Sequence, residues 1–235
     1  MDRSEDLQRT LKENLERVLE RVERALEQAR RKDEGVKILA ASKRQSQEKI
    51  RLLYHLGIRL FGENYVQEAE KKVEALKDLS IEWHLIGRLQ TNKVKKALKI
   101  FDVLETLDRL ELAREIEKRL ADSERVLPVL IEVNIGCEET KAGVTPENFL
   151  KFSEEIVQFR HLEVRGLMCL PPFKEDPEEV RPYFVKMRRL FEEVKPLFGP
   201  NFRELSMGTS QDFEVAIEEG ATIIRLGTIL FGPRR

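Results

Sequence analysis

The feature that most constrains the fold is a series of eight short apolar segments, separated by amphipathic stretches with helical spacing. Strands and helices that alternate in this way form parallel sheets with right-handed crossover connections. Eight such units predict a closed (β/α)8 barrel of the TIM type, and an open doubly wound sheet is the alternative. The predicted strands span residues 36–42, 59–63, 82–87, 101–106, 127–134, 163–170, 204–208 and 222–227.

Cap residues mark the ends of several predicted helices. Thr145 and Asp176 each precede a proline, which is common at the first position of a helix. Asp108 lies three residues before Glu111, which is the spacing of a capping box. Gly57 follows a helical stretch at the position where a glycine commonly ends a helix.

The first part of the chain predicts one extra, long helix over residues 3–31. Its other faces carry charges of both signs, as a solvated surface does. We interpret residues 1–34 as a helix packed on the barrel, within a single domain of residues 1–235. A partner-binding or coiled-coil helix is the alternative. Apolar residues recur at three- and four-residue steps: Leu7, Leu11, Leu15, Val18, Val22, Leu26 and Ala29.

Composition argues against several classes of function. The 235 residues include 42 Lys and Arg against 43 Asp and Glu, a net charge of -1, so no basic excess indicates nucleic-acid binding. No polybasic cluster or long apolar run indicates a membrane. The charged N-terminus lacks the apolar core of a signal peptide, and we therefore expect a cytoplasmic protein. Cys137 and Cys169 form no disulfide or metal-binding pattern, and we expect no metal.

A lysine closes the first predicted strand. Lys43 follows the apolar run 36–42, so its amine has an apolar wall behind it. Burial disfavours the ammonium form, and a neutral lysine amine can form a Schiff base with an aldehyde. A lysine after a strand also commonly reaches into solvent, and Lys43 alone does not decide between the two.

The segments after the last two strands predict an anion site. Ser210 follows Gly208 at the start of a helix, where free backbone N–H groups bind phosphate, although plain capping by Ser210 would leave the same pattern. Gly227 and Thr228 follow the eighth strand, where barrels commonly bind phosphate. Arg225 lies within that apolar strand, so its guanidinium needs an acidic side chain or a ligand acceptor.

A nucleophilic lysine, an arginine and a phosphate site at one barrel mouth match a phosphorylated aromatic aldehyde. Pyridoxal phosphate has that shape, and arginine is one residue known to face its pyridine nitrogen. Asn64, after the second strand, either holds a ligand or caps the next helix. His84 lies within the third strand, and we expect a hydrogen-bonded core residue there.

A set of motifs makes the chain resemble the pyridoxal phosphate homeostasis protein family. They occur in order from about residue 36 to the C-terminal end and so cover nearly the whole chain. The motifs are AASK (40–43), FGENYVQE (61–68), WHLIGRLQTNK (83–93), VN (133–134) with ETKAG (139–143), GLMCLPP (166–172), SMGTS (206–210), and IRLGT (224–228) with FG (231–232).

The resemblance implies a barrel like the cofactor-binding N-terminal domain of alanine racemase, with pyridoxal phosphate held as a Schiff base on Lys43. It also implies that Ser210, Gly227 and Thr228 hold the phosphate, and that Arg225 faces the pyridine nitrogen. The full set of expected cofactor-binding residues is Lys43, Asn64, Ser210, Arg225, Gly227 and Thr228.

The family resemblance also implies a function in intracellular homeostasis of the cofactor, by binding, storage or delivery. Racemisation needs acid–base groups on both faces of the bound substrate. In alanine racemase a second domain supplies one of them, whereas this chain ends soon after Thr228. We therefore expect no dedicated catalytic residues, a monomer, and apo-enzymes as recipients. A low-activity pyridoxal-phosphate-dependent amino-acid racemase is the alternative, and the fold alone also admits an unrelated enzyme acting on a sugar phosphate.

Overall fold

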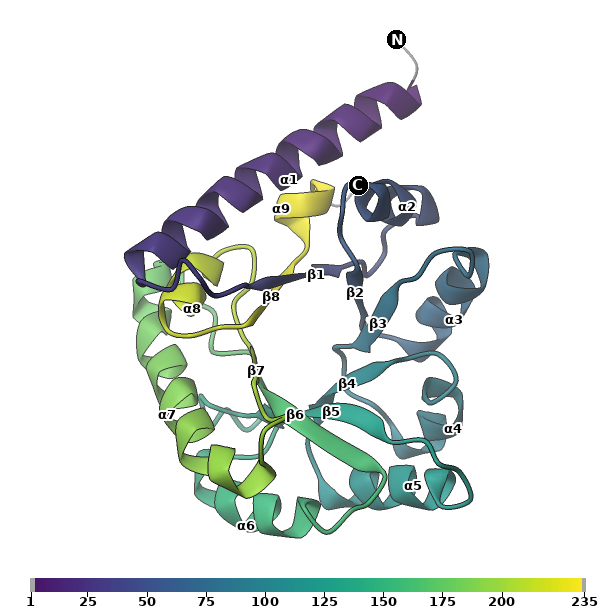
Figure 1. The fold of residues 1–235 in the computed structure, drawn as a ribbon, viewed down its shortest axis with the longest axis vertical. Coiled ribbons are helices and arrows are strands. Elements are labelled where there is room, and N and C mark those ends of the chain that lie inside the picture. The colour runs from purple at the N-terminus through teal and green to yellow at the C-terminus, as the bar shows by residue number, and fades with distance from the viewer. Residues whose placement is uncertain (1–2, 234–235) are drawn as a thin grey trace.

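Eight parallel strands follow one another around a closed barrel, in which β8 pairs with β1 (Figure 1). The structure is a computed structural model and describes residues 3–233. The eight predicted strands and the closed barrel are confirmed, and the open sheet is wrong because β1 has a partner on both sides. The strands are β1 (Lys37–Ala41), β2 (Leu60–Glu63), β3 (Glu82–Leu85), β4 (Val103–Leu107), β5 (Leu127–Val133), β6 (Leu162–Cys169), β7 (Glu204–Ser206) and β8 (Ile223–Leu226).

Helices surround the barrel and cover the outward faces of the strands (Figure 1). Because side chains alternate along a strand, every second residue packs under a helix and the others point into the barrel. Phe61, Leu104 and Ile131 belong to the large outer core. These helices are α2 (Gln47–His55), α3 (Val66–Ala75), α4 (Val94–Ala97), α5 (Leu110–Leu120), α6 (Pro146–Ile156), α7 (Arg181–Phe198), α8 (Phe213–Glu218) and α9 (Thr228–Phe231), with short 3-10 turns η1 (Thr91–Lys93) and η2 (Pro177–Val180).

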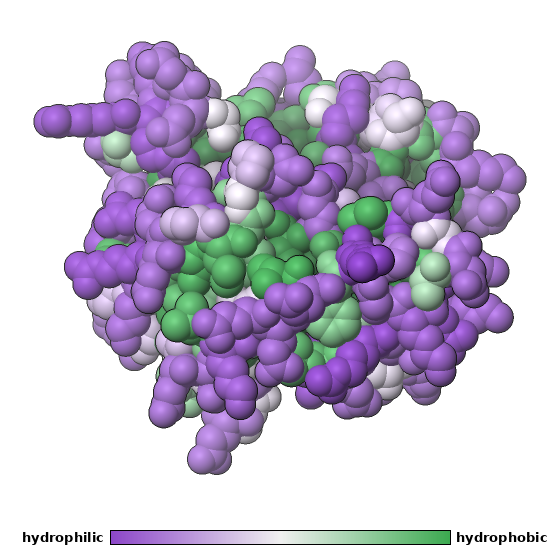
Figure 2. Space-filling model, turned by 60° about the horizontal axis from the view of Figure 1, so that its bottom comes forward, coloured by the Kyte–Doolittle hydropathy of each residue, from purple (hydrophilic) through white to green (hydrophobic). Residues whose placement is uncertain are grey.

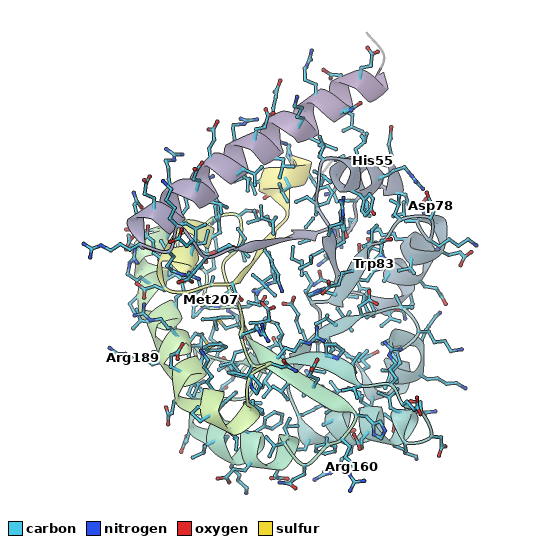
Figure 3. The ribbon with its side chains drawn as sticks, viewed as in Figure 1. His55, Asp78, Trp83, Arg160, Arg189 and Met207 are labelled. Atoms are coloured by element: carbon cyan, nitrogen blue, oxygen red, sulfur yellow. The ribbon has the colours of Figure 1, made fainter. Side chains whose placement is uncertain are left out.

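The inward-facing side chains form a much smaller apolar cluster of Leu39, Leu130, Met168 and Ile223. The rest of the interior is polar, and side chains with nitrogen and oxygen atoms project into the space enclosed by the strands (Figure 3). Burying polar groups is unfavourable unless they are hydrogen-bonded. The polar interior must therefore be organised as a network of hydrogen bonds.

Helix α1 (Arg3–Gln28) crosses the outside of the barrel over α8, α9 and α2 (Figure 1). The predicted long helix is thus present, although it ends three residues before the expected Arg31. Its apolar stripe is covered by the chain itself, since Leu11 and Val18 are fully buried. Arg21 adds a two-bond ion pair with Glu214, at 2.8 and 2.6 Å. Over the part of α1 whose side chains are described, residues 5–28, Leu19 is the one large apolar residue that is exposed, so no apolar stripe is left for a coiled-coil partner.

The predicted helix caps have mixed outcomes. Thr145 is the N-cap residue of α6, and Asp176 caps η2 ahead of α7. The capping box at Asp108 is wrong, because Arg109 is the N-cap residue of α5. The carboxylate of Asp108 pairs instead with the guanidinium groups of Arg109 and, at 3.3 Å, Arg88. Two nearby positive charges compete successfully with a neutral backbone N–H for the same oxygens.

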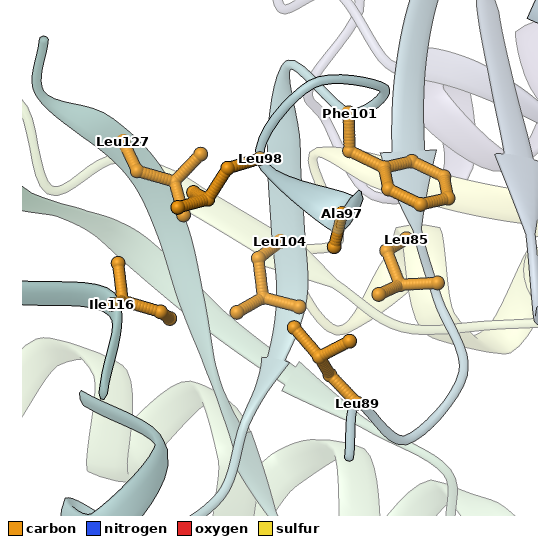
Figure 4. Close-up of a pocket in the computed structure, with 8 residues that line it drawn as sticks. All are labelled: Leu85, Leu89, Ala97, Leu98, Phe101, Leu104, Ile116 and Leu127. Atoms are coloured by element: carbon orange, nitrogen blue, oxygen red, sulfur yellow. The ribbon is translucent and has the colours of Figure 1, made fainter. Parts of the chain in front are cut away.

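A small void lies between the outer faces of the strands and helices α4 and α5 (Figure 4). Its volume is about 10 Å³, and only apolar side chains line it. A space of this size hardly holds one water molecule and offers it no polar partner. It is a packing void and not a ligand site. The lining residues are Leu85, Leu89, Ala97, Leu98, Phe101, Leu104, Ile116 and Leu127.

The surface is largely hydrophilic, although apolar residues gather in the middle of the face shown in Figure 2. The most exposed large apolar side chains include Phe173 in the loop after β6, at 71%, and Tyr65 after β2, at 53%. Among residues 3–233, no helix has both the length and the apolar content that spanning a bilayer requires. The same residues contain no cluster of His, Cys, Asp and Glu arranged to hold a metal ion.

Candidate functional site

The residues singled out in the sequence gather at one end of the barrel. In a barrel of parallel strands, all the carboxyl-terminal strand ends open at the same mouth. Lys43 and Asn64 follow β1 and β2, whereas Ser210 lies in the loop after β7. Arg225 lies within β8, and Gly227 directly follows that strand. Thr228 is the first residue of α9, so all six positions belong to this mouth.

Lys43 presents a half-buried amine at the mouth. Among the described residues, its Nζ forms no ion pair, and it lies 5.3 Å from the centre of the Tyr65 ring. A cation at that distance is attracted by the aromatic face. The contact orients the side chain without occupying its nitrogen in a hydrogen bond. Within the part of the chain that the structure describes, the Lys43 amine is therefore left open toward the mouth.

The Asn64 side chain does not cap the helix that follows it. The N-cap residue of α3 is Tyr65, and within residues 3–233 the Asn64 amide makes no hydrogen bond. The capping alternative is therefore wrong. Gly87 packs directly on this residue, since a Cβ at position 87 would lie 2.3 Å from the Asn64 carbonyl oxygen. As far as the described chain shows, the half-buried amide is left open to a ligand.

The loops after β7 and β8 meet through Ser210. Its hydroxyl accepts a hydrogen bond from the Gly227 N–H at 3.3 Å. Ser210 does not cap α8, whose N-cap residue is Asp212, so plain capping is wrong here as well. Ser210 and Thr228 line an open depression of about 680 Å³, together with Gln211, Ile229 and Pro233.

Gly208 permits the close approach of this loop to α8. Its φ of +95° lies in the left-handed region, and a Cβ there would lie 2.6 Å from the Cβ of Ala216. Only glycine satisfies both conditions without strain. Any residue with a β-carbon at position 208 would therefore strain the backbone just before Ser210.

Arg225 is buried and points into the barrel, with 5% of its surface exposed. One terminal nitrogen donates to the Ser206 hydroxyl at 2.7 Å, and the other donates to the Cys169 carbonyl oxygen at 2.7 Å. Its acceptors are thus a hydroxyl and a backbone carbonyl. Neither neutralises the guanidinium, so its positive charge remains near the mouth.

The charge that balances Arg225 lies one residue further along the network. The Ser206 hydroxyl donates to Glu105 Oε2 at 2.6 Å, and Glu105 is fully buried. Burial by itself raises the pKa of Glu105, but hydrogen bonding to His84 and the charges of His84 and Arg225 outweigh it, and the pKa is lowered. Glu105 is therefore an ionised carboxylate inside the barrel.

His84 continues the network to the opposite end of the barrel. Its Nδ1 lies 2.6 Å from Glu105, and its Nε2 lies 3.0 Å from Glu82 at the start of β3. Burial lowers the pKa of His84, but hydrogen bonds to both carboxylates raise it to about 9. The expected hydrogen-bonded core histidine is confirmed, but its link to Arg225 was not foreseen. The sequence feature that could have indicated this network is Glu105, a lone acidic residue in an apolar strand.

Glu132 in β5 is a second buried carboxyl that the sequence reasoning missed. It is 8% exposed, and its Oε2 has no hydrogen-bond partner in the described part of the chain. Burial and the nearby charge of Asp108 raise the pKa of Glu132 to about 7, against the opposing charges of Arg225 and Arg88. This carboxyl takes up a proton near neutral pH.

The sequence of this chain matches a protein family and several of its members. Residues 10–235 match the family described as alanine racemase, N-terminal domain. A pyridoxal phosphate homeostasis protein of Aquifex aeolicus is 52% identical over 95% of this chain and 98% of its own length. The resemblance found in the motifs is thereby confirmed.

Solved structures agree with this relationship. PipY of Synechococcus elongatus, described as having PLP bound, superimposes with a TM-score of 0.77 and 34% identity over 84% of this chain and 92% of that one. Alanine racemase from Corynebacterium glutamicum shares only the fold, with a TM-score of 0.72 and 16% identity over 97% of this chain and 62% of that one. The chain therefore belongs to the pyridoxal phosphate homeostasis protein family.

Proposed function

We propose that this protein binds pyridoxal phosphate at the carboxyl-terminal mouth of its barrel and serves the intracellular homeostasis of that cofactor by binding, storing or delivering it. One observation carries the proposal. The mouth combines the amine of Lys43, which forms no ion pair within residues 3–233, with an open depression lined by the hydroxyl groups of Ser210 and Thr228. The name of the Aquifex aeolicus relative and the cofactor described in PipY support the same assignment.

The phosphate half of the cofactor fits the loops after β7 and β8. Ser210 and Thr228 provide hydroxyl groups, and the Gly227 N–H at the start of α9 would exchange its present acceptor, the Ser210 hydroxyl at 3.3 Å, for a phosphate oxygen. These are the neutral donors that bind phosphate oxygens in many proteins. The depression is open to solvent, which suits a cofactor that must enter and leave.

The ring half of the cofactor fits Arg225 and Asn64. The guanidinium carries more N–H donors than the two that Ser206 and Cys169 accept, so it can also donate to a pyridine nitrogen. Arginine does not give up its proton at ordinary pH, and the ring would remain a weak electron sink. The Asn64 amide is free to contact the ring edge. These features favour holding the cofactor over using it in catalysis.

Lys43 is proposed to hold the cofactor covalently, as a Schiff base. Its neutral amine adds to the aldehyde carbon, a C=N bond forms, and the aldehyde oxygen leaves as water. Pyridoxal phosphate supplies the aldehyde, and the protein supplies the amine and the surrounding hydrogen bonds. The proposal includes a cytoplasmic monomer with no dedicated catalytic residues, which passes the cofactor to apo-enzymes.

A low-activity amino-acid racemase is the second candidate. The Tyr65 ring close to Lys43 Nζ favours it, because a phenol and an amine near one ligand could act as a pair of acid–base groups. Racemisation of free amino acids at ordinary enzymatic rates, lost in Lys43→Ala, would replace the homeostasis proposal with this one. Tyr65 is 53% exposed, and a ring so open to solvent is not fixed by packing in the position that an acid–base group needs.

The direct test is the near-visible absorption spectrum of the purified protein with added pyridoxal phosphate. We expect a band that sodium borohydride removes, with the reduced adduct on the peptide that contains Lys43. Lys43→Ala should abolish both, whereas Lys95→Ala, which changes an exposed lysine, should leave both intact. A colourless wild-type protein, or an adduct spread over surface lysines, would refute the proposal. It would instead suit a barrel enzyme of another kind.

A further inference from the structure

We propose that Lys72 and Glu68 of helix α3 are positioning residues for Lys43, which aim its amine into the barrel mouth by holding the backbone on both of its sides. This inference rests on the proposed function, in which Lys43 bonds to pyridoxal phosphate. Neither residue needs to touch the cofactor.

Both peptide groups that flank Lys43 are held from α3. Lys72 Nζ donates to the carbonyl oxygen of Ser42 at 2.7 Å, in the peptide group before Lys43. Glu68 Oε1 accepts from the N–H of Arg44 at 2.5 Å, in the peptide group after it. Lys72 and Glu68 are themselves joined at 2.7 Å, one helical turn apart. One ion pair therefore fixes the orientation of two successive peptide planes.

The turn that carries Lys43 needs such support. The N–H of Gln45 donates to the Ser42 carbonyl at 2.9 Å, which closes a four-residue turn over Lys43 and Arg44. Arg44 has a φ of 60°, in the left-handed region that favours glycine. A residue with a β-carbon keeps this conformation only where its surroundings enforce it. The hydrogen bond from Arg44 to Glu68 is the contact that does so.

The chemistry of Lys72 argues for a purpose beyond stability. Its side chain is only 7% exposed, and its ammonium donates at 2.7 Å to each of three oxygens, from Ser42, Glu63 and Glu68. A buried ion pair is often no more stabilising than apolar residues of similar size. Apolar residues in place of both Lys72 and Glu63 would fill the space without the desolvation of charges. What such apolar side chains could not do is hold the Ser42 carbonyl.

Glu63 completes the arrangement from β2. Its Oε1 accepts from Lys72 at 2.7 Å and from the Ser42 hydroxyl at 2.6 Å, while its Oε2 is buried without a partner among the described residues. Burial raises the pKa of Glu63, although Lys72 opposes that effect. Three elements, β1, β2 and α3, thus converge on the backbone next to Lys43. The Tyr65 ring at the start of α3 contacts the Lys43 side chain itself.

The test compares adduct formation with simple binding. Lys72→Met and Glu68→Gln would be mixed with pyridoxal phosphate, and the rate of the borohydride-reducible adduct at Lys43 measured by absorbance. Pyridoxine 5′-phosphate, which has the phosphate and ring but no aldehyde, would report binding alone. We expect adduct formation to slow by about tenfold to a hundredfold in Lys72→Met, because a small misplacement of reacting groups slows a reaction by about that factor. The affinity for pyridoxine 5′-phosphate should change by less than about threefold, within the scatter of single-site effects.

Two further variants complete the test. Arg21→Met breaks the Arg21–Glu214 ion pair that joins α1 to α8, and should leave the adduct rate unchanged despite a loss of stability. Arg44→Gly adopts a positive φ without enforcement by Glu68, so Glu68→Gln with Arg44→Gly should recover part of the rate lost in Glu68→Gln.

The outcomes separate this inference from the proposed function. If wild-type protein forms no adduct at Lys43, the proposed function fails and the positioning role fails with it. If wild type forms the adduct and both α3 variants match its rate, only the positioning role is overturned. The same holds if adduct rate and pyridoxine 5′-phosphate affinity fall together, because that pattern indicates general damage to the site. Should Lys72→Met not fold, Glu68→Gln, whose wild-type side chain is 26% exposed, carries the test by itself.

Discussion

The His84 imidazole and the Glu105 carboxylate lie in contact inside the barrel, with 2.6 Å between Nδ1 and Oε1. Both side chains are buried, so the pair is an imidazolium and a carboxylate shielded from water. Because Glu105 is ionised, the Ser206 hydroxyl donates to it and turns its lone pairs toward Arg225. The guanidinium at the mouth is therefore fixed by charges deep in the barrel.

The positive charge of His84 makes the free energy of unfolding fall as the pH becomes alkaline. The pKa of His84 is raised to about 9 in the folded protein, from an ordinary value of 6.5. Its contribution is fully present below pH 6.5 and is lost as the pH rises through 9, for a total of about 3 kcal/mol. We expect the free energy of unfolding in urea to fall over this window. His84→Gln should be less stable at pH 6 and lack that decline, and an equal decline in both proteins would contradict the assignment.

The Glu132 carboxyl opposes folding above neutral pH. Burial and the charge of Asp108 raise its pKa to about 7 from 4.5, so the folded protein retains a proton that the unfolded chain has released. Stability is therefore lost as the pH rises from 4.5 through 7. Glu132→Gln removes the buried charge and should raise the free energy of unfolding at pH 8 by about 3 kcal/mol, with little gain at pH 4.5. Glu139→Gln, an exposed neighbour, is the control, and a gain of equal size there would exclude this explanation.

The Ser210 hydroxyl should matter for affinity and not for covalent attachment. It lines the open depression and accepts from the Gly227 N–H, so Ser210→Ala removes one phosphate donor and loosens the junction of two loops. We expect the Kd for pyridoxal phosphate, measured by absorbance titration, to rise about tenfold. At saturation the Lys43 adduct should still form. The control is Ser123→Ala, since the Ser123 hydroxyl donates only to the Leu120 carbonyl at the end of α5, and it should leave the Kd unchanged. An equal rise of the Kd in both variants would place Ser210 outside the site.

The outer core can be weakened without touching the site. Leu104 is 2% exposed, faces away from the barrel interior and borders the small apolar void (Figure 4). Leu104→Ala enlarges that void and should lower the free energy of unfolding by about 3 kcal/mol, measured by chemical denaturation. The rate of adduct formation with pyridoxal phosphate should remain that of wild type. A variant that keeps its stability but loses the adduct would show that this side of the barrel communicates with the mouth.

Local patterns were sufficient for the fold. Apolar runs such as 127–134 and amphipathic stretches between them are set by the periodicity of neighbouring residues, and the closed barrel follows from their alternation. The same rule placed Lys43 and Thr228 at one mouth, because parallel strands end at one side. The capping box at Asp108 failed for the opposite reason. One of its two competitors, Arg88, lies in another part of the chain, in the loop after β3.

The sequence by itself determined the order of the strands, the position of the mouth and the types of side chain that reach it. Only the tertiary structure decided which of those side chains meet. Ser206 and Glu105 are 101 positions apart, and Lys72 reaches Ser42 across 30. Such contacts depend on the register of the strands around the barrel and on which face of a helix turns inward. Both are fixed by packing of the whole chain, and no local pattern of residues contains them.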